Sequence, residues 1–258
     1  MPELPEVEHA VRLLRRAVRG RTIAHAELRH PSLARRLPPA VLASLAGARI
    51  ADVTRRGKHQ LIALADGRTL RAHFRMTGDW LVLRAGEEPP RFARAVFELD
   101  DGRRLVLEDS RALATLDVHP AGAPPALDLG PEPADPALTP EYLRARFARR
   151  RGPIKPALLD QRVIAGLGNI YAAEALWRAR IGPRVRASSL SRPRLAALIA
   201  AIRAVIGRAT GARYTEIGAA RLAVYDREGL KCRRCGTPIR RIVQAGRSTY
   251  YCPACQRR

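Results

Sequence analysis

Four cysteines near the C-terminus form two pairs, Cys232-x-x-Cys235 and Cys252-x-x-Cys255, with sixteen residues between the pairs. Two knuckles at this spacing are typical of a zinc finger, in which four thiolates complete a tetrahedral shell. Disulfides are the alternative, but no apolar signal segment follows Met1, so we expect a reducing compartment. The pattern predicts one structural Zn²⁺ ion, because four thiolates leave no open position for catalysis.

Lysine is rare in a very basic chain. Only Lys58, Lys155 and Lys231 are lysines among 47 basic residues. A lysine that persists where arginine fills nearly every cationic position indicates a site that needs a compact ammonium group. The other interpretation is that these three lysines are present by chance and have no special role.

The excess of positive charge is +23 and is concentrated toward the C-terminus. The net charge is +5 over residues 1–130, +11 over 131–227 and +7 over 228–258. This distribution predicts a polyanionic partner for the C-terminal half, although a general basic bias or RNA binding would give the same charge. No apolar run has the length of a membrane span, so we expect a cytoplasmic protein without a membrane partner.

The elements that must position these residues change type along the chain. Residues 5–19 have the apolar spacing of a helix. Residues 22–118 alternate in short runs, with hairpin signals at Asp66-Gly67 and Asp101-Gly102, which predicts an antiparallel β-sandwich or barrel. Residues 119–140 have the composition of a linker, and helical patterns dominate from 141 to about 211.

Three separated segments resemble one family. They are MPELPEVE at the N-terminus, IKPALLDQRVIAGLGNIYAAEALW in the centre and CRRCGTPIRRIVQAGRSTYYCPACQ at the C-terminus, with weaker matches at RRGKHQL and HFRMTG. Together they resemble the formamidopyrimidine-DNA glycosylase and endonuclease VIII family, and are closer to the formamidopyrimidine branch. The resemblance implies a two-domain α+β fold with four parts. These are a catalytic β-sandwich domain over 1–118, a Pro-rich linker over 119–140, a helix-two-turn-helix DNA-binding domain over 141–227 and a zinc finger over 228–258.

The chemistry implied by the resemblance starts at Pro2, once Met1 is removed. An α-amino group titrates near pKa 8, so a useful fraction is neutral and nucleophilic at physiological pH. Attack on C1′ of the damaged nucleotide would expel the base and leave a cationic iminium that promotes elimination of the 3′ phosphate. Glu3 would be the acid/base partner that protonates the sugar ring oxygen. The other interpretation of Glu3 is an acid that favours the dipole of its own helix.

The resemblance assigns further cations to the DNA strand. Lys58 would bind phosphate and assist the proton transfer of β-elimination, and Arg247 would contact a phosphate and assist a second elimination. Lys155 would approach the DNA or the lesion. Lys231 has no counterpart and is expected to be a surface charge.

Other residues would grip phosphates and fill the space left by the extruded nucleotide. His73 and Asn169 match phosphate-binding residues, and Arg151 is a further candidate within a run of three arginines. Met76 and Leu113 would act as apolar wedges. Arg111 would contact the base opposite the lesion.

Two segments depart from the family pattern. Asp109-Ser110-Arg111-Ala112-Leu113-Ala114 stands where the family has Asp-Pro-Arg-Arg-Phe-Gly, so leucine replaces the aromatic wedge and has less stacking area. Residues 211–229 are shorter than the family's lesion-covering loop. Both changes bear on lesion and opposite-base preference.

The sequence therefore predicts a bifunctional DNA glycosylase/AP lyase of base excision repair, acting on 8-oxoguanine and formamidopyrimidines in damaged double-stranded DNA by β,δ-elimination. We expect a monomer, associated with the nucleoid in a bacterium. The alternatives are an endonuclease VIII-like glycosylase for oxidised pyrimidines and a non-catalytic damaged-DNA-binding protein. A metal-dependent nuclease is disfavoured, because no cluster of His, Asp or Glu has ligand spacing.

Overall fold

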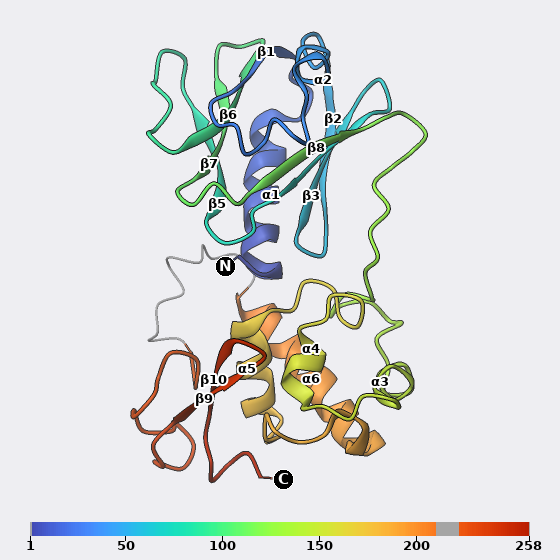
Figure 1. The fold of residues 1–258 in the computed structure, drawn as a ribbon, viewed down its shortest axis with the longest axis vertical. Coiled ribbons are helices and arrows are strands. Elements are labelled where there is room, and N and C mark those ends of the chain that lie inside the picture. The colour runs from blue at the N-terminus through green and yellow to red at the C-terminus, as the bar shows by residue number, and fades with distance from the viewer. Residues whose placement is uncertain (1, 210–221, 258) are drawn as a thin grey trace. The chain divides into compact units, whose positions relative to one another are not determined.

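The computed structural model describes residues 2–209 and 222–257 (Figure 1). The chain forms two compact units, and each is described by itself. The N-terminal unit contains Met1–Pro2 and Glu6–Leu127, and the C-terminal unit contains Glu3–Pro5 and Asp128–Arg258. The sequence predicts four parts. Where each of these parts begins and ends stays a prediction. Among the described residues, no helix has the length and apolar character that crossing a membrane requires.

Two four-stranded antiparallel sheets form the N-terminal unit, with strand orders β1-β6-β7-β5 and β2-β3-β4-β8. The predicted sandwich is thus confirmed, and both predicted hairpin turns join paired strands, with Gly67 and Gly102 in the left-handed region. The strands are β1 (Ile23–Leu28), β2 (Ile50–Arg56), β3 (His59–Leu64), β4 (Thr69–His73), β5 (Gly78–Leu83), β6 (Ala93–Leu99), β7 (Arg104–Asp109) and β8 (Thr115–His119).

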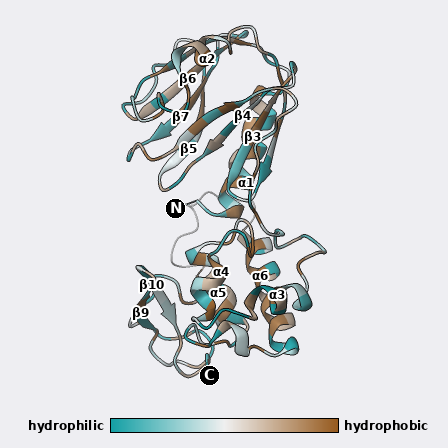
Figure 2. Cartoon of the chain, turned by 45° about the vertical axis from the view of Figure 1, so that its right-hand side comes forward, coloured by the Kyte–Doolittle hydropathy of each residue, from teal (hydrophilic) through white to brown (hydrophobic). Residues whose placement is uncertain are grey.

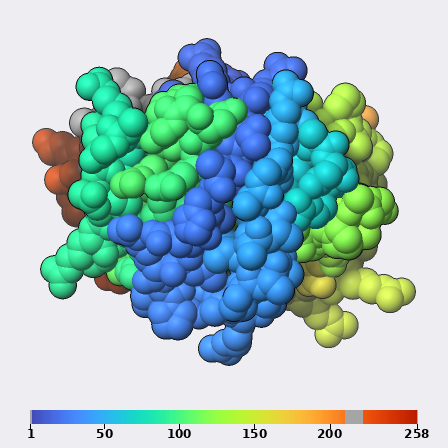
Figure 3. All heavy atoms as spheres, turned by 90° about the horizontal axis from the view of Figure 1, so that it is seen from above, coloured from blue at the N-terminus to red at the C-terminus, as the bar shows by residue number. Residues whose placement is uncertain are grey.

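Helix α1 (Leu4–Val18) completes the core of this unit. Its apolar face, which carries Val7, Val11, Leu14 and Val18, is buried in the same cluster as the inner residues of both sheets. A five-residue helix, α2 (Pro39–Ala43), lies between β1 and β2 in the chain. In Figure 3, the first fifty residues, in blue, lie beside segments near residue 100, in green, as the pairing of β1 with β6 requires.

Helices build the C-terminal unit around a second apolar cluster, and Figure 2 shows hydrophobic residues, in brown, along these helices. The helices are α3 (Pro140–Phe147), α4 (Ile154–Leu158), α5 (Asn169–Arg178) and α6 (Arg192–Ala209), with a short 3-10 helix, η1 (Ala187–Ser189). Helical patterns dominate the sequence from 141 to about 211, but helix α4 ends at Leu158. The carboxylate of Asp160 accepts the backbone N–H of Arg162 at 3.0 Å, and this local turn replaces the helix.

A two-stranded hairpin, β9 (Arg240–Gln244) and β10 (Arg247–Tyr251), lies between the two cysteine pairs. Gln244 pairs with Arg247, and both turn residues between them have positive φ, 48° at Ala245 and 71° at Gly246. Such a two-residue turn matches the twist of the strands. The turn places Arg247 at the start of the second strand.

Candidate functional site

The side chain of Glu3 lies at the start of helix α5 in the C-terminal unit. Oε1 of Glu3 accepts the backbone N–H of Ile170 at 2.8 Å, and Oε2 accepts that of Tyr171 at 3.4 Å. The backbone N–H of Leu4 also donates to the carbonyl of Gly166 at 3.0 Å. The first N–H groups of a helix have no partner within the helix, and the dipole favours an anion there. Glu3 therefore serves the dipole of α5, and its carboxylate is held with only 1% of the residue exposed.

Lys155, on α4, is buried in the same unit with its ammonium group fully engaged. Nζ donates to Oδ1 of Asn169 at 2.5 Å, to the carbonyl of Ser248 at 3.0 Å and to Oγ1 of Thr249 at 2.7 Å. Burial lowers the pKa of Lys155 to about 8, with the carboxylate of Glu3 opposing this shift and Arg247 adding to it. The lysine therefore changes charge near physiological pH and not near its usual value.

Asn169, at the first position of α5, connects three segments of the C-terminal unit. Its amide Nδ2 donates to the carbonyl of Ser248 at 3.1 Å, and its side chain also hydrogen bonds with Tyr225. Burial raises the pKa of Tyr225. The structure thus brings the predicted residues Lys155 and Asn169 together beside the hairpin that carries Arg247.

Glu174 is a buried functional candidate that the motifs do not reveal. Its carboxylate accepts three consecutive backbone N–H groups, from Ala223 and Val224 at 2.8 Å and from Tyr225 at 2.9 Å. These bonds fix the chain at residues 223–225. Most of the segment 211–229, which is predicted to be shortened, lies outside the described residues. The one available signal is a lone acid in the otherwise apolar run NIYAAEALW.

Lys58 and His73 lie in the N-terminal unit. Lys58 is buried and precedes β3, and His73 ends β4, where it pairs with His59 with their rings 4.7 Å apart. Burial lowers the pKa of His73 to about 3, with His59 and Arg75 adding to the effect. Nδ1 of His73 accepts the backbone N–H of Arg75 at 3.0 Å. His73 is therefore a neutral imidazole whose Nε2 carries the proton, and it can donate a hydrogen bond but brings no charge.

The two loops predicted to carry the wedge residues are tied together by Asp109. Its buried carboxylate accepts the hydroxyl of Thr77 from one loop, and the backbone N–H groups of Arg111, Leu113 and Ala114 from the other. Burial would raise the pKa of Asp109, but these hydrogen bonds hold it below its usual value. The carboxylate thus fixes both loops through their backbones.

The wedge candidates are exposed on these loops, as a residue that enters DNA must be. Met76 is 38% exposed and Leu113 is 42% exposed. Arg111 is also exposed, and Arg151 is exposed in the connection between α3 and α4. Pro2 is half-buried at the start of the described chain.

The four cysteines converge as the spacing predicts. Their Sγ atoms all lie within 4.8 Å of one another, with 4.0 Å between Cys232 and Cys255 and 3.5 Å between Cys235 and Cys252. Zn–S bonds of about 2.3 Å in a tetrahedron require S···S distances of about 3.8 Å. The cluster therefore fits one zinc ion held by the four thiolates.

Trp177, in the last turn of α5, connects that helix to the cysteine cluster. Its indole N–H donates to Sγ of Cys232 at 3.4 Å. The guanidinium of Arg234 lies 4.2 Å from the ring centroid and donates to the carbonyl of Trp177 at 3.1 Å. Helix α5 thus holds Glu3 at its first turn and a cysteine of the finger at its last.

Three family models together match most of the chain. The formamidopyrimidine-DNA glycosylase N-terminal domain matches residues 1–116, and the formamidopyrimidine-DNA glycosylase H2TH domain matches residues 129–219. The model of a zinc finger found in FPG and IleRS matches residues 229–258, which contain the four cysteines. The cluster is thus the metal centre of a zinc finger that holds one structural zinc ion.

Curated relatives match the chain over its full length. A formamidopyrimidine-DNA glycosylase from Paracoccus denitrificans is 42% identical over 282 residues, covering 99% of this chain and 100% of the relative. One from Chloroflexus aggregans is 42% identical over 271 residues, covering 99% and 98%. Both alignments exceed the 258 residues of this chain, so the relatives carry residues that it lacks.

Solved structures agree with the fold. MutM in complex with DNA containing carbocyclic 8-oxo-G superposes with a TM-score of 0.90 at 29% identity and covers all of both chains. A point mutant of Lactococcus lactis FPG, in complex with DNA containing Fapy-dG, superposes with a TM-score of 0.91 at 29% identity, again over both whole chains.

Proposed function

Because the chain belongs to the formamidopyrimidine-DNA glycosylase family, we propose that it removes 8-oxoguanine and formamidopyrimidines from duplex DNA and then cuts the strand as an AP lyase. Relatives solved with 8-oxo-G and Fapy-dG DNA support this lesion class. The substrate is damaged double-stranded DNA. We further propose that the protein acts as a monomer in the cytoplasm, at the nucleoid.

The observation that carries the proposal is the fixed carboxylate of Glu3, the residue directly after Pro2. Its oxygens are held by the N–H groups of Ile170 and Tyr171 at the start of α5. A helix start stabilises a carboxylate, so the group is ionised and able to accept a proton. A base held beside the nucleophile is the arrangement that amine catalysis requires.

The proposed first step is attack of the neutral Pro2 nitrogen on C1′ of the damaged nucleotide. The C1′–N bond to the base breaks, and the base leaves with its electron pair. The nitrogen of Pro2 then carries an N–H proton, which Glu3 accepts and passes to the ring oxygen O4′ as the sugar opens. The product is an iminium between Pro2 and C1′.

Elimination follows because the iminium acidifies C2′. Loss of a C2′ proton breaks the C3′–O bond and expels the 3′ phosphate. Loss of a C4′ proton then breaks the C5′–O bond and expels the 5′ phosphate, and water hydrolyses the iminium to release the sugar remnant from Pro2. We assign Lys58 to the first proton transfer and to phosphate binding, and Arg247 to the second elimination.

The remaining predicted residues hold the strand. Lys155, whose three N–H donors are used within the protein, is assigned to the approaching DNA through its charge. Asn169, His73 and Arg151 are assigned to phosphates. The pKa of His73 implies a neutral N–H donor there, so its contact should be insensitive to pH between 5 and 8. Met76 and Leu113 would fill the gap left by the extruded nucleotide, and Arg111 would contact the opposite base.

Single-turnover excision from duplexes that differ only in the lesion tests the proposed substrate class. We expect 8-oxoguanine and a formamidopyrimidine to be released faster than thymine glycol. A strict preference for thymine glycol would place the chain with the glycosylases for oxidised pyrimidines.

A further inference from the structure

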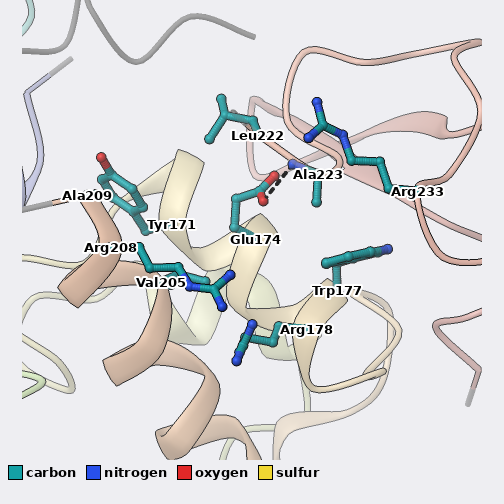
Figure 4. Close-up of a pocket in the computed structure, with 10 residues that line it drawn as sticks. All are labelled: Tyr171, Glu174, Trp177, Arg178, Val205, Arg208, Ala209, Leu222, Ala223 and Arg233. Atoms are coloured by element: carbon teal, nitrogen blue, oxygen red, sulfur yellow. Dashed lines mark hydrogen bonds between the residues drawn. The ribbon is translucent and has the colours of Figure 1, made fainter. Parts of the chain in front are cut away.

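A cavity of about 360 Å³ lies within the C-terminal unit, between the later turns of α5 and α6 and residues 222–223 (Figure 4). Trp177, Val205 and Leu222 contribute apolar surface to its wall. Ligand sites span roughly 300–1,000 Å³, so this cavity has room for one small organic molecule. The proposed base excision and the two eliminations do not use this cavity.

Two guanidinium groups border the cavity from neighbouring helices. Arg178 is in the last turn of α5 and Arg208 is in the last turn of α6, and in Figure 4 they point toward one another. Neither arginine has a hydrogen bond or an ion pair with any residue of the described chain. Helix C-termini favour cations, which explains the charges but not the convergence of two like charges on one cavity.

Among the described residues that line the cavity, Glu174 is the one carboxylate, and it does not pair with these arginines. Glu174 directs its oxygens to the backbone N–H groups of residues 223–225, at 2.8–2.9 Å. Figure 4 shows this carboxylate turned toward Ala223 and away from the two guanidinium groups. The cavity therefore combines an apolar wall, an indole ring, the available N–H donors of Arg178 and Arg208, and a third guanidinium group, that of Arg233, which has an interaction of its own.

We infer that this cavity binds one nucleotide, with the phosphate between Arg178 and Arg208 and the base against Trp177, one face of whose indole is covered by Arg234. Guanidinium groups bind phosphate through paired N–H donors, and aromatic side chains stack on any base. The cavity is too small for a duplex. The nucleotide is therefore either a free mononucleotide or an unpaired nucleotide of a DNA strand.

Titration with deoxyadenosine 5′-monophosphate tests the inference in a Trp80→Phe background, where Trp177 is the one remaining tryptophan of the chain. Saturable quenching of Trp177 fluorescence is expected, with deoxyadenosine and inorganic phosphate each binding at least tenfold more weakly. Arg178→Gln combined with Arg208→Gln should weaken the nucleotide at least tenfold. Arg194→Gln, a change at a half-buried position in the first turn of α6, away from the cavity lining, is the matched control and should leave binding unchanged.

Two results would overturn the inference. One is the absence of saturable quenching by the mononucleotide and by a short oligo(dA) strand, in protein whose circular dichroism and melting temperature are normal. The other is equal binding by the double variant and the parent. Because both substitutions are at exposed positions, loss of folding is not expected, and melting curves verify this.

The same variants distinguish the two sources of the nucleotide. If the double substitution weakens the mononucleotide alone, the site takes free nucleotides; if it weakens oligo(dA), the site takes an unpaired nucleotide of a strand. The strand interpretation rests on the proposed function, so adduct formation on abasic DNA is measured in parallel. If the protein forms no adduct but still binds the nucleotide, the repair chemistry alone is refuted. If it forms the adduct but does not bind the nucleotide, this site alone is refuted.

Discussion

A β-carbon placed on Gly168 would lie 2.4 Å from Cδ of Glu3 and 2.6 Å from its Oε1. No real β-carbon sits this close to another atom, and the side chain of Glu3 is buried, so it has little freedom to move away. Gly168 has an extended backbone that any residue adopts. The requirement for glycine at this position is therefore the space that the carboxylate occupies.

Gly168→Ala should consequently displace Glu3 and slow base excision by about 100-fold, because a shift of about 1 Å in a catalytic group costs this much. The measurement is single-turnover excision of 8-oxoguanine, with affinity for an uncleavable tetrahydrofuran duplex measured alongside. Gly207→Ala is the control, since a β-carbon there meets nothing within 4 Å, and it should raise the unfolding free energy by about 0.5–1 kcal/mol. Normal excision by Gly168→Ala would remove Glu3 from the mechanism.

The pKa of Lys155 predicts how DNA binding depends on pH. The ammonium is cationic below its pKa, which burial brings to about 8, so its electrostatic attraction for the DNA strand should be lost as the pH rises through 8. Lys155→Met should weaken a tetrahydrofuran duplex about tenfold at pH 7, because a cation close to the phosphates is removed. It should also flatten the profile between pH 7 and 9. Lys231→Met should keep the parental profile, and an identical slope in Lys155→Met would contradict the assignment.

Leu113 is exposed, so its role in DNA extrusion can be separated from stability. Leu113→Ala should change the unfolding free energy by no more than about 0.5 kcal/mol. It should slow nucleotide extrusion by about 60-fold, because three carbons are removed from a contact that becomes buried and each costs about 0.8 kcal/mol. Fluorescence of 2-aminopurine opposite the lesion reports the extrusion. Val82→Ala, a change at a residue 38% exposed, is the control, and an equal effect there would eliminate Leu113 as a wedge.

Trp177 should stabilise the zinc site through its N–H bond to Cys232. Groups that hydrogen bond to metal ligands typically change metal affinity by about 10–100-fold. Trp177→Phe should therefore release zinc at least tenfold faster to a chromogenic chelator, whereas Trp80→Phe should not. Lyase activity should survive brief EDTA treatment and fade as the finger loses its metal. Equal release rates in both variants would show that the indole N–H does not support the site.

Patterns of local spacing predict most of this fold. The alternating runs before residue 118, the Asp-Gly turns and the cysteine spacing each depend on neighbours in sequence, and each has its expected counterpart in the structure. The helical pattern predicted from 141 onward is interrupted after Leu158, because the side chain of Asp160 accepts a backbone N–H that a longer helix would use. Such competition depends on geometry that a periodic pattern does not contain.

The polar residues that hold the site in place were harder to predict than the motif residues. The sequence predicts that Glu3 takes part in the chemistry or serves the dipole of its own helix. In the structure, its carboxylate lies at the start of α5, which is 166 residues away in the chain. Asp109 and Glu174 each bind backbone N–H groups of a loop, contacts that follow only from the tertiary fold. Their signal in the sequence is weak, since an acid beside apolar residues is usually solvent-exposed.

The central claim is that the nitrogen of Pro2 forms the covalent link to DNA. Borohydride reduction of the processed protein on abasic-site duplex, followed by peptide mass spectrometry, tests it most directly. We expect one adduct, on the peptide that begins with Pro2, and no adduct with protein that retains Met1. An adduct on Lys58 or Lys155, or full activity with Met1 in place, would contradict it.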